Sequence, residues 1–221
     1  MEAARVRAAI RGLPEPETPL IAVAGGSAER AVRLSRQHAA AGVGGLVSFG
    51  IAGGLDPSLL PGDIIVGAMV WHNSGQPIEM TASWAQSIAA RLEPECRVRI
   101  GGIAGVDSPV ISPAAKSALA KRSGALAVDM ESHGMASVAA DLGIPILVIR
   151  AIADPSVRTI PVAALAGMAP DGHRRPLAVL GRLLSRPQDL PGLIRLAGDS
   201  AAAMRSLTVA AKVLFREASG C

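Results

Sequence analysis

Residues 145–152 read PILVIRAI, an almost continuous aliphatic run that contains one charged residue, Arg150. Such a run is typical of a central parallel strand, because a strand covered by helices on both faces needs apolar side chains on both sides. Outward from this strand, apolar runs alternate with segments of helical spacing along most of the chain. This alternation predicts an α/β fold of three layers, in which helices flank a central mixed, mostly parallel sheet.

The expected elements follow from apolar periodicity and from Gly, Pro and capping residues. Strands are expected at residues 20–24, 46–49, 64–70, 98–104, 126–128 and 145–152, and helices at 28–41, 81–92, 113–121, 131–142, 177–184 and 190–214. We expect a glycine-rich loop at 50–55 and a long loop with short helices at 155–175. In the last helix, residues 190, 193, 194, 197, 201 and 204 form one apolar stripe. No repeat or linker is visible, so the whole chain, residues 1–221, is expected to form a single domain.

The composition excludes several classes of protein. Half of the 221 residues are hydrophobic, but only 2 Phe, 2 Trp and no Tyr are present, so small aliphatic residues must form the core. The net charge of +4 comes without basic clusters interleaved with aromatic residues, which argues against nucleic-acid binding. Cys96 and Cys221 lie far apart and no secretory signal precedes the fold, so we expect reduced thiols and a cytoplasmic location.

Two segments carry the candidate chemistry, VDMESHG at 128–134 and RAIADP at 150–155. Both lie where a predicted strand ends, and ligands of open α/β sheets bind at that edge. At a helix start Glu131 is favoured in its ionised form and could accept hydrogen bonds from two ribose hydroxyls. Taken alone, Glu131 could equally be a helix-start carboxylate and Asp154 a turn cap before Pro155.

The combination of VDMES, RAIAD and FGIAGGLDPSLLPGDIIV resembles the nucleoside phosphorylase and methylthioadenosine/S-adenosylhomocysteine nucleosidase superfamily, over roughly residues 20–170. Within it, GVDSPVISPAAK, VDMESHGMASVA and RRPLAVLGRLLSRPQDLPGLIRLA look most like the hopanoid-associated phosphorylases, which act on adenosylhopane. The resemblance implies a phosphorylase-like fold in a homodimer or larger homo-oligomer. It also implies an enzyme of hopanoid side-chain biosynthesis that releases adenine from a 5′-substituted adenosine.

The resemblance also implies roles for individual residues. Asp154 matches the general acid at purine N7, a role that needs a raised pKa. Glu131 matches the acceptor of ribose hydroxyls, and Arg150 matches a buried arginine whose alternative role is a structural ion pair. The remaining ribose- and base-binding positions are Met130, Ala52, Gly53, Pro109 and Val110.

Two departures from the superfamily concern the nucleophile. Where the hexameric phosphorylases have an Arg–x–x–Ser that binds phosphate, residues 48–51 read SFGI. Phosphate, the one candidate co-substrate, would need Arg174 and Arg175, or the backbone N–H groups of Gly25 and Gly26 at a helix start. The alternative for the arginines is a solvated helix start. The N-terminal residues 1–20 also lack the superfamily's first strand and the acidic residue that positions the nucleophile, for which Glu29 is a weak substitute.

These departures keep other readings open: a catalytically silent nucleoside-binding protein of the same fold, or a methylthioadenosine/S-adenosylhomocysteine nucleosidase. No other cofactor is expected, and no metal site, because the four histidines show no i,i+4 pair and no cysteine partner. No run is apolar enough to cross a bilayer. The leucine-rich helices from residue 177 onward could contact a membrane surface peripherally, or could be ordinary core and subunit packing.

Overall fold

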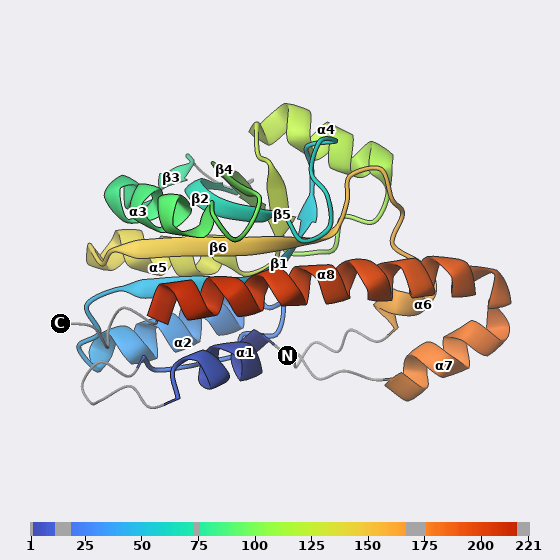
Figure 1. The fold of residues 1–221 in the computed structure, drawn as a ribbon, viewed down its shortest axis with the longest axis horizontal. Helices are drawn as coiled ribbons and strands as arrows, with labels where there is room; N and C mark the ends of the chain where they lie inside the picture. The colour runs from blue at the N-terminus through green and yellow to red at the C-terminus, as the bar shows by residue number, and fades with distance from the viewer. Residues whose placement is uncertain (1, 12–18, 73–75, 167–175, 216–221) are drawn as a thin grey trace.

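A mixed β-sheet forms the centre of the computed structural model, which describes residues 2–11, 19–72, 76–166 and 176–215 (Figure 1). The strands of the described residues are β1 (Leu46–Gly54), β2 (Ile64–Trp71), β3 (Ile78–Glu79), β4 (Val98–Gly105), β5 (Ala127–Asp129) and β6 (Ile146–Asp154). Their order is β3-β2-β4-β5-β1-β6, and β2 also pairs with β6, so the sheet closes on itself. The predicted α/β fold with a mixed sheet is confirmed. The long pairings β1–β6 and β2–β4 are parallel, as is β4–β5, while the short pairings β1–β5, β2–β3 and β2–β6 are antiparallel.

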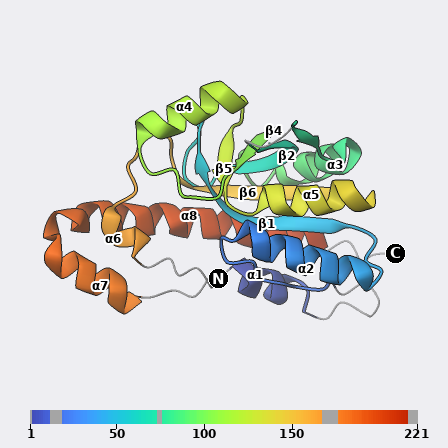
Figure 2. The ribbon, with the colours of Figure 1, turned by 180° about the vertical axis from the view of Figure 1, so that it is seen from behind.

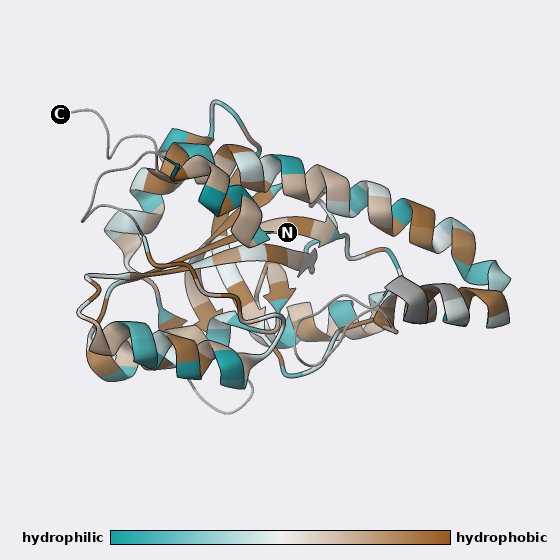
Figure 3. Cartoon of the chain, turned by 90° about the horizontal axis from the view of Figure 1, so that it is seen from below, coloured by the Kyte–Doolittle hydropathy of each residue, from teal (hydrophilic) through white to brown (hydrophobic). Residues whose placement is uncertain are grey.

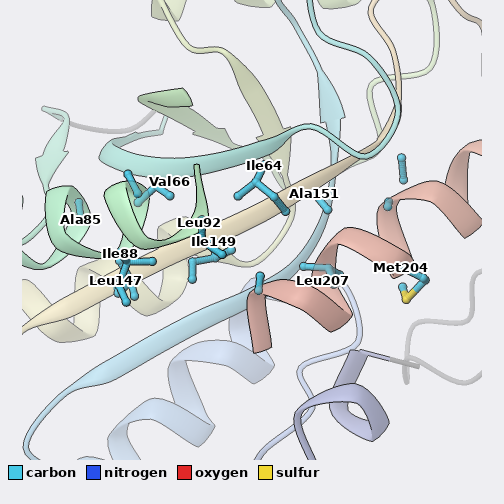
Figure 4. Packing of buried hydrophobic residues seen from close by; sticks show 14 residues of the cluster. Ile64, Val66, Ala85, Ile88, Leu92, Leu147, Ile149, Ala151, Met204 and Leu207 are labelled. Atoms are coloured by element: carbon cyan, nitrogen blue, oxygen red, sulfur yellow. The ribbon is translucent and has the colours of Figure 1, made fainter. Parts of the chain in front are cut away.

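Strand β6 is buried along its whole length, as its aliphatic sequence predicts. It lies between β1 and β2, and its side chains alternate between two cores. Leu147, Ile149 and Ala151 enter the core shown in Figure 4, while Val148 and Ile152 enter the core on the opposite face. This two-residue period places apolar layers on both sides of one strand.

Helices cover both faces of the sheet. Helices α3 (Ala82–Leu92) and α8 (Leu190–Phe215) pack on the face that holds Ile149, and α5 (Ser132–Leu142) packs on the other face. Figure 2 shows α5 from behind, with α2 (Ala28–Ala40) beside it. Helix α1 (Glu2–Ala9) contacts α8, and α4 (Pro113–Ser123) lies above the end of β5 (Figure 1).

The expected strand at residues 20–24 is wrong. Residues 19–25 have no regular structure, and Leu20 and Val23 are 59% and 50% exposed. A strand needs a partner, and both edges of the nearby β1 are occupied by β5 and β6. An apolar run is therefore insufficient evidence for a strand where no sheet edge is open.

The expected glycine loop at residues 50–55 is also wrong, because β1 continues to Gly54. Strand β6 pairs with β1 residue by residue as far as Gly53 and Asp154, with a register shift between Ala52 and Gly53. A Cβ atom at Gly53 would lie 3.1 Å from Cγ1 of Val128. The glycines therefore permit close strand packing rather than a turn.

Helix α6 (Val162–Leu165), helix α7 (Pro176–Ser185) and the first half of α8 extend beyond the sheet and are called the arm below (Figures 1 and 3). The short helix expected within residues 155–175 is thus present, and the helix at 177–184 is confirmed. The predicted apolar stripe of α8 is wrong in its first half, since Leu190 and Ile194 are 46% and 64% exposed. The buried residues of α8 lie where the helix passes over the sheet: Asp199, Ala203, Met204, Leu207, Ala210 and Ala211.

No helix of the described residues is both long enough and apolar enough to cross a membrane.

Candidate active site

Asp154 is the last residue of β6, and its carboxylate is held by a buried lysine. The Nζ of Lys116 donates to Oδ2 of Asp154 at 2.5 Å, to the carbonyl of Pro155 at 2.9 Å and to the carbonyl of Arg158 at 3.0 Å. Lys116 is fully buried although it lies in the otherwise mostly exposed helix α4. Its three N–H groups are thus used to fix one carboxylate and the segment that follows it.

Burial raises the pKa of Asp154 above its ordinary value, while the hydrogen bond and charge of Lys116 and the charge of Arg158 oppose that increase. Desolvation disfavours the ionised carboxylate, which is the condition for a carboxyl group that transfers a proton near neutral pH. A general acid needs a raised pKa, and at Asp154 the physical cause of that increase is burial.

Gly53 links Asp154 to the second candidate segment. It pairs with Asp154 on one side and with Val128 on the other, and an added Cβ would lie 3.7 Å from Oδ2 of Asp154. Ala52 is different, because its side chain is buried in the core beneath α5. Of these two predicted binding residues, Gly53 is the one beside the candidate acid.

Glu131 is the N-cap residue of α5, one position earlier than the first helical turn in which the sequence places it. Its Oε1 accepts the backbone N–H of Gly26 at 2.5 Å. Gly25 and Gly26 have φ angles of 70° and 80°, a left-handed conformation that glycine adopts without strain. One oxygen of Glu131 is thus fixed, and a carboxylate keeps further acceptor sites on its second oxygen.

Arg150 lies inside a hydrogen-bonded network beneath Glu131. The arginine is 1% exposed; its Nε donates to Oδ2 of Asp129, and its Nη2 donates to Oγ of Ser48 at 2.6 Å and Oγ of Ser132 at 2.9 Å. Oδ1 of Asp129 also accepts the backbone N–H groups of Glu131 at 3.3 Å and Ser132 at 3.1 Å. This buried network fixes the start of α5, which favours the structural role over direct catalysis for Arg150.

The segment before α4 is tied to the segment after β6. Ile160 donates its backbone N–H to the carbonyl of Ile111 at 3.0 Å. Val110 packs on a core that includes Val128, and Pro109 is half-buried. The predicted base-binding residues therefore lie on a segment that contacts the segment following Asp154. Met130, also half-buried, directly precedes Glu131.

The candidate phosphate residues divide into two groups. Arg174 and Arg175 lie outside the described residues. The N–H of Gly26 is already bound to the Glu131 carboxylate, but a surface hollow begins at the next residue and is lined by Ser27, Glu29, Arg30 and Arg33. Ser27 caps α2 by accepting the N–H of Arg30 at 3.2 Å.

Sequence reasoning missed Lys116, Asp129, Ser132 and Ser48. Asp129 and Ser132 carry a local signal, because an Asp three residues before a Ser at a helix start is a capping pattern. Lys116 and Ser48 carry none, since they approach their partners only in the folded chain.

The expectation that no metal site is present rested on the spacing of the histidines along the chain. The structure brings His72, Asp107 and His133 together, so that one potential ligand atom from each lies within 4.8 Å of the others. These residues come from the end of β2, the segment after β4 and the first turn of α5.

Comparisons with known proteins agree with this geometry. A model of the phosphorylase superfamily matches residues 16–184, and the chain therefore belongs to this superfamily. The resemblance to the superfamily is confirmed, and with it the expectation of an enzyme of the nucleoside phosphorylase and nucleosidase class. A comparison with curated protein sequences gives no match.

Solved structures with similar folds include nucleosidases and a futalosine hydrolase from bacteria. The 5′-methylthioadenosine/S-adenosylhomocysteine nucleosidase of Helicobacter pylori, solved in complex with a pyrrolidine compound, is 22% identical with a TM-score of 0.62; the match covers 71% of this chain and 82% of that one. The futalosine hydrolase of the same organism is 18% identical with a TM-score of 0.65, covering 98% and 91%. A putative methylthioadenosine nucleosidase of Weissella paramesenteroides is 16% identical with a TM-score of 0.64, covering 96% and 93%. At these identities the similarity establishes the fold.

Proposed function

We propose that this protein cleaves the N-glycosidic bond of a 5′-substituted adenosine and releases adenine. The observation that carries the proposal is Asp154, a buried carboxyl group with a raised pKa at the end of β6, beside Gly53. The similar structures, which include methylthioadenosine nucleosidases and a futalosine hydrolase, support a nucleoside as the substrate.

In the proposed reaction Asp154 donates a proton to N7 of adenine while the C1′–N9 bond breaks. The bonding electrons leave with the base, so an oxocarbenium ion forms at C1′. Glu131, fixed by Gly26, accepts hydrogen bonds from the ribose hydroxyls. Water then attacks C1′ to give the free sugar, or phosphate attacks it to give the sugar 1-phosphate.

The test replaces the proton donor alone. We expect Asp154→Asn to lower the rate of adenine release by about a hundred- to ten-thousand-fold, because a positioned general acid contributes that much. The matched control is Asp141→Asn, an exposed carboxylate of α5 paired with Arg36. Undiminished release by folded Asp154→Asn would refute the assignment.

A catalytically silent, nucleoside-binding protein is the second candidate, favoured because described residues 2–11 contain helix α1 and no strand at the end of the chain where the superfamily has its first strand. Calorimetry with methylthioadenosine, beside an adenine-release assay, separates the two. Binding without release, with and without phosphate, would favour the silent protein.

Phosphate as co-substrate is proposed to bind at the hollow beside Gly26, where Arg33 supplies an exposed positive charge and the start of α2 supplies a positive helix dipole. Phosphate should then accelerate adenine release, and Arg33→Gln should weaken this dependence. Arg36→Gln, on the same helix but paired with Asp141, is the control. Equal release without phosphate would instead favour hydrolysis.

For the substrate we propose adenosylhopane, on the likeness of the segments that carry Lys116, Glu131 and the arm to hopanoid-associated phosphorylases. Comparison of kcat/KM for adenosylhopane, methylthioadenosine and S-adenosylhomocysteine tests this choice. A preference for either smaller nucleoside would make the protein a methylthioadenosine/S-adenosylhomocysteine nucleosidase.

We also propose that the protein forms a homodimer or larger homo-oligomer. Sedimentation velocity measures this oligomeric state directly.

A further inference from the structure

Two histidines that are distant in sequence stack against each other beside one carboxylate. The rings of His72 and His133 are 4.2 Å apart and parallel to within 1°. Nε2 of His133 lies 3.2 Å from Oδ1 of Asp107, and Nε2 of His72 lies 3.7 Å from Oδ2 of the same residue. Both rings therefore direct the same nitrogen toward one carboxylate.

The ring of His133 is closely packed, yet one of its two nitrogens has no hydrogen-bond partner. Its side chain is 10% exposed, and its Nδ1 is buried without a hydrogen-bond partner. A Cβ atom at Gly105 would collide with the His133 ring, so a glycine is needed at that position. The close fit against Gly105 therefore fixes the direction of Nε2, the ring nitrogen that faces Asp107.

We propose that His72, Asp107 and His133 bind a divalent transition-metal ion of the zinc type. Two imidazoles and one carboxylate are a donor set that suits Zn²⁺, Co²⁺ and Ni²⁺, and that suits Mg²⁺ poorly. Three protein ligands leave a fourth tetrahedral position for water or another ligand.

The geometry requires the His72 ring to rotate out of the stack, because an imidazole nitrogen binds a metal in the plane of its own ring and two parallel rings cannot share one ion. The side chain of His72 is 28% exposed, so this rotation is open to it. In tetrahedral coordination with bonds of about 2.0 Å, ligand atoms are separated by about 3.3 Å. The His133–Asp107 distance of 3.2 Å already meets this spacing, and the 3.7 Å to His72 is close to it. Asp107 has a side chain that is 76% exposed, so its carboxylate can rotate toward the ion.

The site would tie the segment that carries Pro109 and Val110 to the start of α5, two residues after Glu131. The proposal does not depend on the proposed reaction.

The test is calorimetric titration of the tag-free, full-length protein, stripped with chelator, with ZnCl₂. We expect one ion per chain, and a rise in Tm on binding. His72→Gln and Asp107→Asn, at partly and largely exposed positions, should fold and should each weaken affinity by about tenfold or more. His38→Gln in α2 should bind zinc like the wild type.

A second readout identifies the ligands. Co²⁺ should give visible absorption bands of a four-coordinate site with the wild type and not with His72→Gln, and MgCl₂ should give no binding heat. Zinc binding that is absent, or that is equal in the wild type, His72→Gln and Asp107→Asn, would overturn the proposal. The latter result would assign the ion to other groups, such as the Cys96 thiol.

Discussion

At the scale of single residues, Lys116 sets the charge that Asp154 experiences. A general acid works in its protonated form, so activity falls as the pH rises through its pKa. Burial raises the pKa of Asp154 and the Lys116 ammonium opposes this effect. Lys116→Gln keeps an N–H donor but removes the charge, so we expect the alkaline limb of the kcat/KM profile to move to higher pH.

The control for Lys116 lies on the same helix. Lys121 is exposed near the end of α4, and Lys121→Gln should leave the profile in place. An unchanged alkaline limb in Lys116→Gln, measured on folded protein, would show that Lys116 only anchors the carbonyls of Pro155 and Arg158.

Arg150 is a residue whose role stability measurements can decide. Arg150→Met would leave the Asp129 carboxylate buried beside Ser132 without its cation. Breaking a buried pair from one side costs about 3–5 kcal/mol, so we expect a loss of this size in the free energy of unfolding. Arg36→Met, which breaks an exposed pair with Asp141, should cost at most about 1 kcal/mol. Unchanged stability together with lost adenine release would instead indicate direct catalysis.

Candidate residues in local sequence motifs were predicted, whereas contacts between residues that are distant in sequence were not. Asp154 and Glu131 stand in short motifs at the ends of β6 and β5, so the sequence itself marks both as candidates, although the two strands run in opposite directions. The partner of Asp154 is 38 residues away, on helix α4, and nothing in the sequence around Lys116 shows that its ammonium faces inward and not solvent. Likewise, no periodicity predicts that Gly26 binds the Glu131 carboxylate across 105 residues.

At the scale of elements, the crossing of α2 and α5 positions Glu131. A Cβ atom at Gly134 would lie 2.6 Å from the carbonyl oxygen of Ala28, a rigid backbone atom of α2. Gly134→Ala must therefore separate the two helices, and we expect a loss of about 1–3 kcal/mol in unfolding free energy. Because Gly26 precedes α2 and Glu131 precedes α5, the same shift should lengthen their hydrogen bond and raise KM.

Gly198→Ala is the matched control for this prediction. Gly198 is exposed in α8, and nothing lies within 4 Å of an added Cβ. The alanine should stabilise the helix by about 0.5–1 kcal/mol and leave KM unchanged. Equal effects of the two substitutions, in urea unfolding and in KM, would contradict the assigned role of the α2–α5 contact.

Elements with a strong period were predicted well, and elements decided by pairing were not. The run at 145–152 became β6 because both its faces are buried. Residues 50–54 look like a loop from their glycines, but the close approach of β5 and β6 extends β1 through them. The apolar residues of α8 follow helical spacing, but the sheet is too short to cover the first half of this helix.

At the scale of the molecule, the arm exposes apolar and basic side chains together. Val162, Leu184, Leu190 and Ile194 are between 39% and 80% exposed, and Arg182 and Arg195 are exposed beside them in α7 and α8. Exposed apolar groups with flanking arginines are typical of surfaces that contact anionic lipid headgroups. The proposed substrate carries a hopanoid group, which is poorly soluble in water and partitions into membranes.

We therefore expect the protein to co-sediment with phosphatidylglycerol vesicles at low salt and to dissociate as salt screens the arginines. Leu184→Ser combined with Ile194→Ser should lower the bound fraction, because two apolar side chains no longer enter the headgroup region. Leu142→Ser is the matched control, since Leu142 is 47% exposed at the end of α5, outside the arm. If the wild type stays in the supernatant at low salt, or if all three proteins bind equally, the arm does not contact the membrane, and its apolar residues are left for contact between subunits.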